Sequence, residues 1–432
     1  MLKLDIYRMS LKYERIIFTG VYFVNKWGVE NVNRSTLKKA GKVWVEKDII
    51  SAEQLNRILE LYPTREPRIL LTIFSILLIS IGFLIFIFSD WAQVPHFSRI
   101  LLVAVFMVGL YVAGYILYEK GQEILGITFL ILGFVVFGAG LLLAINIYSI
   151  VLYSAWPFVL WSLMALVLFM LYEHHWMFSI GVTVTTIGQI NSGIQFGSFN
   201  YLLIAILLLG FTHFAYHRQE KLFSYLIAIS YSLQATIFMS AHNQEYYWLI
   251  VYFLMMYLIS YLIKRELFAN PIKNISLVSI FILGMFQTII LQDIFYFDLE
   301  LRYSLLFLVL WIILFSSILA LKLFKRDNAS LANLVLFLPV FYLPFASIFS
   351  LIILFAFSLA WIILGYRKDI HFKVLICSIA FLLSTFTAYV QYAWATMNKS
   401  LFFIIGGLML LVMSMVIDRQ RRLLQGQRGD ER

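Results

Sequence analysis

Long apolar runs separated by short polar connections fill residues 69–417 of the chain. A bilayer core of about 30 Å is crossed by about 20 helical residues, and packed bundles tolerate somewhat shorter spans. The pattern therefore predicts an all-α fold, a polytopic transmembrane helix bundle of about 14 spans. The expected spans are residues 69–89, 99–118, 125–148, 151–171, 176–191, 199–217, 222–240, 246–263, 275–291, 303–323, 330–344, 346–366, 372–390 and 400–417.

Two parts of this pattern are less regular than the rest. The run 176–191 is short and rich in Thr and Gly, so we expect it to face the bundle interior or a cavity rather than lipid on all sides. The run 330–366 contains Pro339 and Pro344, and proline removes a backbone donor and interrupts a helix. It is either a short hairpin or one broken helix, and the apolar pattern alone leaves both alternatives open.

The segment before the first apolar run is the only sizeable part of the chain outside the predicted spans, and its apolar residues recur at helical spacing. Ser51 followed by Gln54 forms a capping box, in which two side chains satisfy backbone N–H groups at the start of a helix. We therefore predict a small N-terminal cytoplasmic helical domain over residues 1–68. It is expected to be a hairpin, with one helix near 34–47 and a second from Ser51 to Tyr62.

The composition excludes a soluble protein. Hydrophobic residues make up 62% of the chain and charged residues 13%, whereas soluble domains carry roughly 25% charged residues. The surrounding medium is therefore the lipid bilayer. The net charge of +10 does not indicate a nucleic-acid partner, because the charges lie between apolar runs. A single cysteine excludes an intrachain disulfide framework and a Cys-rich metal site.

The positions of the basic residues predict an orientation. When successive connections are assigned to alternate sides, all but three of the 33 Lys and Arg residues fall on the side of the N-terminus; the exceptions are Arg99, Arg302 and Lys399. Because basic residues are retained on the cytoplasmic side, we predict a multi-pass protein of the cell membrane with both termini in the cytoplasm. Residues 418–432 would form a basic cytoplasmic tail. Treating 330–366 as one helix would place the last basic segments outside, so the charges favour the hairpin.

The predicted spans contain no Asp, Glu, Lys or Arg well inside them, which counts against an antiporter driven by a membrane-embedded carboxylate. Their polar groups are amides. Such amides commonly bond to a neighbouring helix, or they could line a polar cavity. The candidates for that cavity are Asn146, Gln189, Asn191, Gln234 and Gln287, with Gln391 as a further amide inside a span.

Four histidines lie at the cytoplasmic ends of two predicted spans: His174, His175, His213 and His217. His213 and His217 share a helix face, as metal ligands often do, so the four are a weak candidate for a metal site. Interfacial histidines without any metal are the alternative. We predict no metal and no cofactor.

A second polar group follows the first predicted span on the outer side. It consists of Asp90, Trp91, His96 and Arg99, and it could bind a headgroup or a sugar-like substrate. The alternative is that these are solvated loop residues. No nucleophile or acid–base pair is identifiable, so no catalytic residue is predicted.

Several motifs resemble a family of bacterial membrane proteins catalogued as domain of unknown function 2157. They are Trp44 with Ile50-Ser51-Ala52-Glu53-Gln54, Ile58 and Tyr62; Gly82 with Asp90-Trp91 and Pro95; and the third run from Gly133 through Gly138-Ala139-Gly140 to Tyr148. The resemblance covers roughly residues 35–150. Asn146 departs from it, since Gln is expected there. The family has no assigned activity, so the resemblance implies residence in a bacterial cell membrane and supplies no catalytic residues.

Three functions are compatible with these features. The first is a transporter or flippase-like protein that moves a small or amphipathic substrate, indicated by the number of spans and the polar run 176–191. The second is a non-catalytic scaffold or sensor, whose residues 1–68 bind a cytoplasmic protein partner or anionic lipid. The third is an intramembrane enzyme acting on lipid-linked sugars. The sequence favours a protein that is not an enzyme and leaves the question open.

Overall fold

The computed structural model describes residues 50–60, 95–218, 220–296, 304–324, 328–343, 345–367 and 371–396, together with separate positions within 41–45, 71–85 and 398–415. Regular structure in these residues is helical throughout, and none of them lies in a β-strand. The expected all-α fold is therefore confirmed. The contacts divide the chain into two units, residues 1–82 and residues 83–432.

The N-terminal unit contains a short helix with a small apolar core. Helix α3 (Ala52–Glu60) begins at the predicted capping box: the Ser51 N–H donates to Gln54 Oε1 at 2.9 Å, and the Gln54 N–H donates to Ser51 Oγ at 3.1 Å. Leu55 and Leu59 are buried, and Trp44 is among the apolar residues that pack on them. Gly41, Trp44 and Val45 are helical, while the rest of the first helix expected near 34–47 lies outside the described residues.

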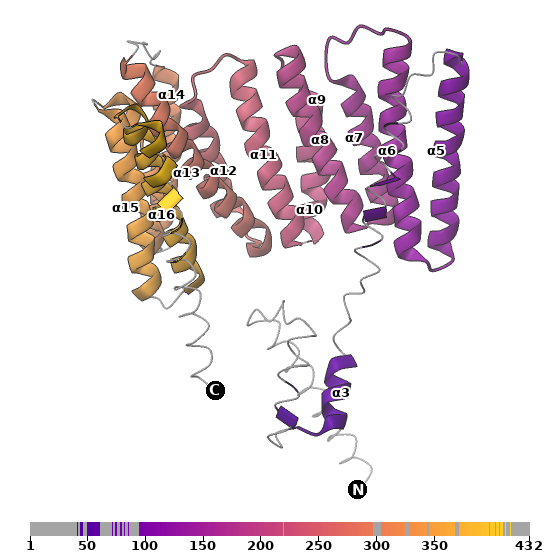
Figure 1. Ribbon diagram of the computed structural model, residues 1–432, viewed down its shortest axis with the longest axis horizontal. Coiled ribbons are helices and arrows are strands. Elements are labelled where there is room, and N and C mark those ends of the chain that lie inside the picture. Colours follow the sequence, from indigo (N-terminus) through magenta and orange to yellow (C-terminus); the bar gives the residue numbers. More distant parts are fainter. Residues whose placement is uncertain are drawn as a thin grey trace. The chain divides into compact units, whose positions relative to one another are not determined.

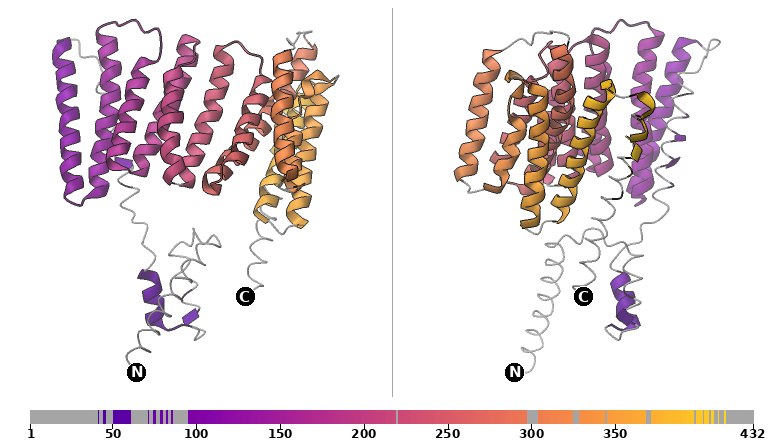
Figure 2. Two further views of the ribbon diagram at one scale, coloured as in Figure 1. Left: turned by 180° about the vertical axis from the view of Figure 1, so that it is seen from behind. Right: turned by 60° about the vertical axis from the view of Figure 1, so that its left-hand side comes forward.

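The second unit is a succession of helices that lie side by side largely in chain order (Figures 1 and 2). Its elements are α5 (His96–Glu119), α6 (Glu123–Ile147), α7 (Trp156–Tyr172), α8 (His175–Phe196), α9 (Tyr201–Ala205), η1 (Ile206–Phe211), α10 (Thr212–Arg218), α11 (Lys221–Ala241), α12 (Trp248–Leu262), α13 (Glu266–Tyr296), α14 (Leu305–Phe324), η2 (Asn328–Phe337), η3 (Val340–Tyr342), α15 (Ala346–Arg367) and α16 (His371–Thr396). Neighbours pack as α5 on α6, α7 on α8, α8 on α11, and α11 on α13. Helix α13 also contacts α12, α15 and α16, so it links the two halves of the unit.

Many of these helices are built to cross a membrane. Within the described residues, eight helices are long and apolar enough to do so, and α7 and α12 are shorter apolar helices. Their outward side chains are apolar, as at Leu209 of η1, which is 79% exposed. Lipid tails are as apolar as leucine, so this surface suits a bilayer and not water. The chain is therefore a multi-pass membrane protein. The number of spans stays a prediction, because residues 69–89 and 400–417 are described only at separate positions.

Helix α8 is the polar helix of the bundle, and it is longer than the run 176–191 suggested. It packs between α7 and α11, with Thr185, Thr186 and Gln189 among its buried residues. Glycines let it approach its neighbours: a Cβ added at Gly188 would lie 2.5 Å from Cβ of Phe158. The expectation that this helix faces the interior is confirmed.

The expected span 199–217 is a composite of α9, a π-helical turn η1 and α10. Thr212 donates its hydroxyl to the Leu207 carbonyl at 2.9 Å, five residues earlier, where the wider turn offers an acceptor. Gly210 lies in this turn, and a Cβ there would approach Leu166 Cδ2 to 2.8 Å. Such π-helical turns are rare and frequently occur at functional sites.

The run 330–366 is a hairpin and not one broken helix. Its first arm is the ten-residue 3₁₀ helix η2, and Phe345, with φ of 58°, lies in the turn before α15. Trp361 of α15 donates to Asn333 of η2 at 2.5 Å, so residues in the middle of each arm meet across the short connection, as in a hairpin. A 3₁₀ helix rises about 2.0 Å per residue against about 1.5 Å in an α-helix, so ten residues extend over about 20 Å and not about 15 Å. The tighter helix therefore lets a short apolar run reach further across the bundle.

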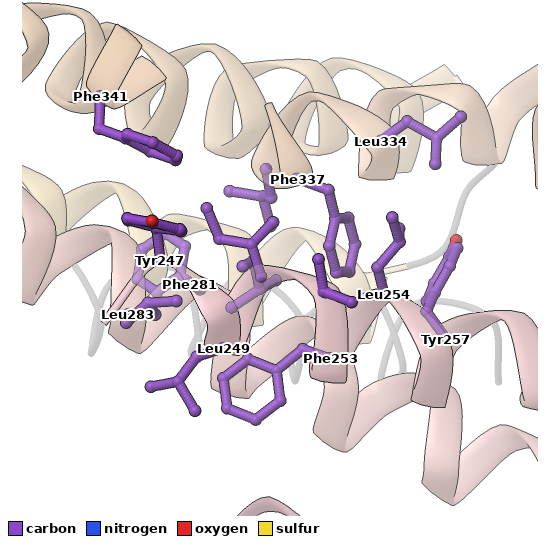
Figure 3. Close-up of a cluster of buried hydrophobic side chains, with 14 of the residues drawn as sticks. Tyr247, Leu249, Phe253, Leu254, Tyr257, Phe281, Leu283, Leu334, Phe337 and Phe341 are labelled. Carbon is purple, nitrogen blue, oxygen red and sulfur yellow. The ribbon is translucent and has the colours of Figure 1, made fainter. Parts of the chain in front are cut away.

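An aromatic core joins η2 and η3 to α12, α13 and α14 (Figure 3). Tyr247 and Phe341 stack with their ring centroids 4.5 Å apart, and Phe307 packs on both. Trp311 of α14 donates its indole N–H to the Phe337 carbonyl at 2.8 Å. This bond provides a partner for a backbone group of the 3₁₀ helix, a group that lipid cannot satisfy.

Candidate functional site

Buried hydroxyls and amides connect α8, α11 and α13 inside the bundle. Thr186 and Ser230 share a hydrogen bond of 2.6 Å between α8 and α11, and Gln234 donates to the same Ser230 oxygen at 3.2 Å. On the next face of α11, Ser232 accepts from Ser279 of α13 at 3.0 Å. Each of these bonds replaces a partner that lipid cannot provide.

A second group continues from α13 to α15 and α16. Thr288 donates to Ser350 of α15 at 3.2 Å, and Gln391 of α16 donates its amide to the Thr288 carbonyl at 3.2 Å. Gln287 is buried beside Thr288 on α13. We call the combined set the polar seam: Thr186, Ser230, Ser232, Gln234, Ser279, Gln287, Thr288, Ser350 and Gln391.

Three amides of the polar seam each leave one polar atom without a hydrogen bond to any part of the protein that the structure describes. The atoms are Gln234 Oε1, Gln287 Nε2 and Gln391 Oε1, on side chains that are 1%, 4% and 6% exposed. A buried group without a partner costs about 1–3 kcal/mol, and the cost rises in the absence of water. All three lie in the second half of helices α11, α13 and α16. The unsatisfied groups therefore gather toward one end of the bundle.

The structure does not bring all the predicted cavity residues together. Gln234 and Gln391 hydrogen-bond to other members of the polar seam. Gln287 is buried next to Thr288 in the sequence of α13 and has no described bond to another member. Gln189 is fully buried elsewhere: with its amide oriented to satisfy both partners, it exchanges two 3.0 Å bonds with the backbone of Asn200. Asn191 is only half-buried, and Asn146 is exposed in the last turn of α6. Gln189 therefore has a structural role, and Asn146 is not part of the interior.

The four candidate histidines form two separate pairs. The rings of His174 and His175 stack with centroids 4.2 Å apart, and those of His213 and His217 lie 4.3 Å apart. Among the described residues, no group of three or more His, Cys, Asp or Glu side chains could hold a metal ion. The interpretation of these four as one metal site is therefore not supported, because i,i+1 and i,i+4 pairing joins them only two at a time.

His174 has a structural role at the start of α8. Its Nδ1 accepts a 3.3 Å hydrogen bond from the Trp176 N–H and caps the helix. Burial lowers the pKa of the His174 imidazole, His175 lowers it further, and Glu123 opposes the shift. The neutral ring is therefore the form that caps α8.

Of the candidate outer-face residues, Asp90 and Trp91 lie outside the described residues. His96 and Arg99 lie in the first turn of α5, His96 exposed and Arg99 half-buried. The grouping of these four remains a prediction.

Sequence reasoning missed one buried charge. Lys322 of α14 is 0% exposed, and its Nζ lies 4.9 Å from the ring centroid of Tyr257 and 5.6 Å from that of Tyr261. It falls in the last turn of the expected span 303–323, so the apolar pattern placed it at a solvated flank. The rings that Lys322 meets belong to α12, some sixty residues earlier in the chain, and no local pattern in the sequence indicates that packing.

Polar contacts gather the turns with basic residues at one end of the bundle, here called the basic end. Arg218 at the end of α10 forms an ion pair with Glu173 at the end of α7. Arg265, before α13, donates to the Tyr216 carbonyl at 2.5 Å and lies over the Tyr216 ring. The end of α12 also belongs to the basic end, because the ring of its Tyr261 lies next to Lys273 and Lys322. These contacts agree with the alternation of connections used to predict the orientation.

Comparison with known proteins supports the resemblance described above. Residues 42–178 match the family described as predicted membrane protein (DUF2157). The match confirms the resemblance and extends it beyond residue 150 to residue 178, in the first turn of α8. No curated protein and no solved structure matches the chain. The family description names the membrane and assigns no chemistry, so a proposal of function has to rest on the bundle itself.

Proposed function

We propose that this protein is a transporter or flippase-like protein that moves a small or amphipathic substrate through its bundle. The observation that carries the proposal is the polar seam, in which three buried amides each keep one unsatisfied atom. A dry structural contact would favour pairing every such atom or replacing it with an apolar group. An amide that must exchange partners with a passing substrate or with water needs the capacity that Gln234, Gln287 and Gln391 retain.

The backbone supports the same function. The 3₁₀ helix η2 and the π-helical turn η1 lie within or beside the bundle, and both depart from the α-helix. Non-helical backbone at membrane depth is tolerated where it is buried in protein or lines a path, and it is common in transporters. These elements are therefore the places where a rearrangement would cost the fewest regular hydrogen bonds.

We also infer that the protein lies in the cell membrane with both termini in the cytoplasm. The support is that all but three of the 33 basic residues belong to connections on the side of the basic end or to the terminal segments. In this orientation the unsatisfied amides lie toward the outer half of the membrane, so the seam would open outward. Reporter fusions at the C-terminus test the orientation: a reporter active only outside the cell should stay inactive, and its activity would contradict the inference.

Cysteine labelling tests the proposed function. In a full-length Cys377→Ser background, we expect Ser230→Cys in the seam to react with a water-soluble thiol reagent at least about ten-fold faster than Ala228→Cys. Both positions are buried on α11, at 2% and 1% exposure, so the pair differs mainly in facing polar or apolar neighbours. Equal and slow labelling of both would mean a dry, sealed interior and would overturn the transporter.

A second candidate is the scaffold or sensor, and one observation favours it: the N-terminal unit has an apolar core of its own around Leu55 and Leu59. Deleting residues 1–68 separates the two functions. A transporter would keep the difference in labelling between Ser230→Cys and Ala228→Cys after the deletion. A scaffold would lose its cellular role while its membrane part still inserts.

A further inference from the structure

The hydrogen bonds between α8 and α11 fix the orientation of the Gln234 amide. The Thr186 hydroxyl donates its proton to the Val182 carbonyl at 2.7 Å, so its 2.6 Å bond with Ser230 has to use the Ser230 proton. With that proton engaged, the Ser230 oxygen can only accept, and it accepts from Gln234 Nε2 at 3.2 Å. The carbonyl oxygen of the Gln234 amide is therefore the atom left without a partner in the described contacts.

The orientation of the Gln391 amide is fixed in a simpler way. Its Nε2 lies 3.2 Å from the Thr288 carbonyl oxygen, which accepts hydrogen bonds and cannot donate them. Gln391 Oε1 is therefore the atom without a described partner. Gln287 adds one amide nitrogen that lacks an acceptor among the described residues. The seam thus presents two carbonyl oxygens that need a donor and one nitrogen that needs an acceptor.

The helices that carry these amides provide little charge beside them. Helix α8 contains no Asp, Glu, Lys or Arg, and in α11 only the first residue, Lys221, is of these types. Among the described residues, Lys322 is the only one of these four types that is buried, and it lies at the basic end. A buried ion without a counter-charge is strongly unfavourable. An ionic substrate would therefore meet no compensating charge among the described groups of the seam.

We propose that the polar seam receives an uncharged, hydroxyl-bearing group, the chemistry of a polyol or of a sugar headgroup. This inference rests on the proposed function and names the substrate class of the same site. A hydroxyl both donates and accepts, so it suits the carbonyl oxygens of Gln234 and Gln391 as well as the amide nitrogen of Gln287. A carboxylate or phosphate anion offers only acceptors, which the two carbonyl oxygens cannot use. A cation offers donors but brings a charge that the seam does not compensate.

Thiol reagents that differ only in their terminal group test this inference in the full-length protein, reconstituted in phosphatidylcholine vesicles. The hydroxyethyl, sulfonatoethyl and trimethylammonioethyl methanethiosulfonates carry a hydroxyl, an anion and a cation on the same reactive group. The measured quantity is the labelling rate of Ser230→Cys divided by that of Ala228→Cys, both in the Cys377→Ser background. This ratio cancels the intrinsic reactivity of each reagent and its entry through lipid. We expect the ratio to be at least about ten-fold larger for the hydroxyl reagent than for either charged one.

Propyl methanethiosulfonate is the matched control reagent, because it has the size of the hydroxyethyl reagent and lacks the hydroxyl. We expect its ratio to be close to one. A ratio for the propyl or a charged reagent as large as that for the hydroxyl reagent would overturn the inferred substrate class and leave the transporter standing. A ratio close to one for all four reagents would mean a sealed interior and would overturn both.

Protection from labelling distinguishes a free polyol from a lipid headgroup. Erythritol in solution, or glucosylceramide in the vesicle, is added before the hydroxyethyl reagent, and one of them should slow the labelling of Ser230→Cys several-fold. Protection by erythritol identifies a free polyol, and protection by glucosylceramide alone identifies a headgroup. Protection by neither would overturn the inference. Melting temperatures verify that the variants fold, and Ser350→Cys, which is 3% exposed on the Gln391 side of the seam, replaces Ser230→Cys if that variant does not fold.

Discussion

The polar seam and the lysine–aromatic cluster, in which Lys273, Lys322 and Lys373 lie over the rings of Tyr261, Tyr257 and Trp361, are two ways of placing polar groups among apolar helices. The seam is uncharged, lies toward the end remote from the basic end, and leaves three amide atoms unsatisfied among the described contacts. The cluster carries three charges, lies at the basic end, and has its aromatic side chains joined by hydrogen bonds through Asn333.

The difference indicates that hydrogen bonds hold the cluster in one arrangement, whereas the seam has polar atoms that can still form hydrogen bonds. A network in which each polar atom has a partner rigidifies its surroundings, whereas a partly satisfied network costs free energy in the resting state. We therefore expect substitutions in the cluster to destabilise the fold. Substitutions in the seam should leave stability nearly unchanged and alter function.

The largest expected effect is that of Asn333→Leu. It removes the acceptor of the Trp361 indole and the donor to the Tyr257 hydroxyl, and each buried group left without a partner costs about 1–3 kcal/mol. We expect a loss of about 3 kcal/mol, measured by thermal unfolding in detergent. Asn270→Leu, at an exposed position of α13, is the control and should change stability little. Equal melting temperatures of the two variants would show that the cluster is not tied together as described.

Gln189→Leu should have the next largest effect. It leaves the N–H and the carbonyl of Asn200 without the two 3.0 Å bonds that the Gln189 amide supplies. The expected loss is about 2 kcal/mol, from the same unfolding measurement. Gln195→Leu, which is exposed on the same helix, is the matched control. A Gln189→Leu protein as stable as Gln195→Leu would contradict the structural role of Gln189 and would make it a candidate for contact with a substrate.

Acidification should have a smaller effect, through His174. Because its pKa in the folded protein is lowered from 6.5, the unfolded chain binds the proton more tightly. The stability from the neutral cap is thus present above pH 6.5 and is lost as the pH falls through the lower folded value. The loss is limited to about the 1 kcal/mol of a helix cap. His174→Asn keeps a cap and should flatten this pH dependence, and an unchanged dependence in that variant would contradict the assignment to His174.

The smallest expected effect on stability is that of Gln234→Leu. This substitution removes an amide whose Oε1 has no described partner, at the cost of one bond to Ser230, so the two contributions nearly cancel to within about 1 kcal/mol. Labelling of Ser230→Cys by a water-soluble reagent should nevertheless slow several-fold in this background. A large loss of stability with unchanged labelling would show that the seam has a structural role. It would contradict the expected difference between the seam and the cluster.

Much of the fold follows from local patterns. The capping box at Ser51 and Gln54 formed as predicted, since its two bonds span only three residues. The distribution of basic residues favoured a hairpin at 330–366 over one broken helix. The 3₁₀ geometry of η2 was not predicted, because it depends on packing against α14 and α15.

The site was predicted less completely, and particular residues show why. Gln234 and Gln287 could be named because an amide inside an apolar run stands out in the sequence. The different surroundings of Gln189 and Asn146 could not be predicted, because the partner of a side chain depends on which neighbouring helix its position faces. Lys322 was overlooked because a lysine at the end of a span ordinarily reaches water. In the structure it is buried, against the rings of Tyr257 and Tyr261 from another helix.

The sequence by itself determined that lipid surrounds the protein, that the fold is helical and that the basic residues divide unequally between two sides. These properties depend on the free energy of transferring each residue into lipid. The tertiary structure decided which polar groups meet, which amides stay unsatisfied and which lysine is enclosed. Those outcomes depend on contacts between helices far apart in the chain, such as Trp361 with Asn333 or Gln391 with Thr288, which no local pattern encodes.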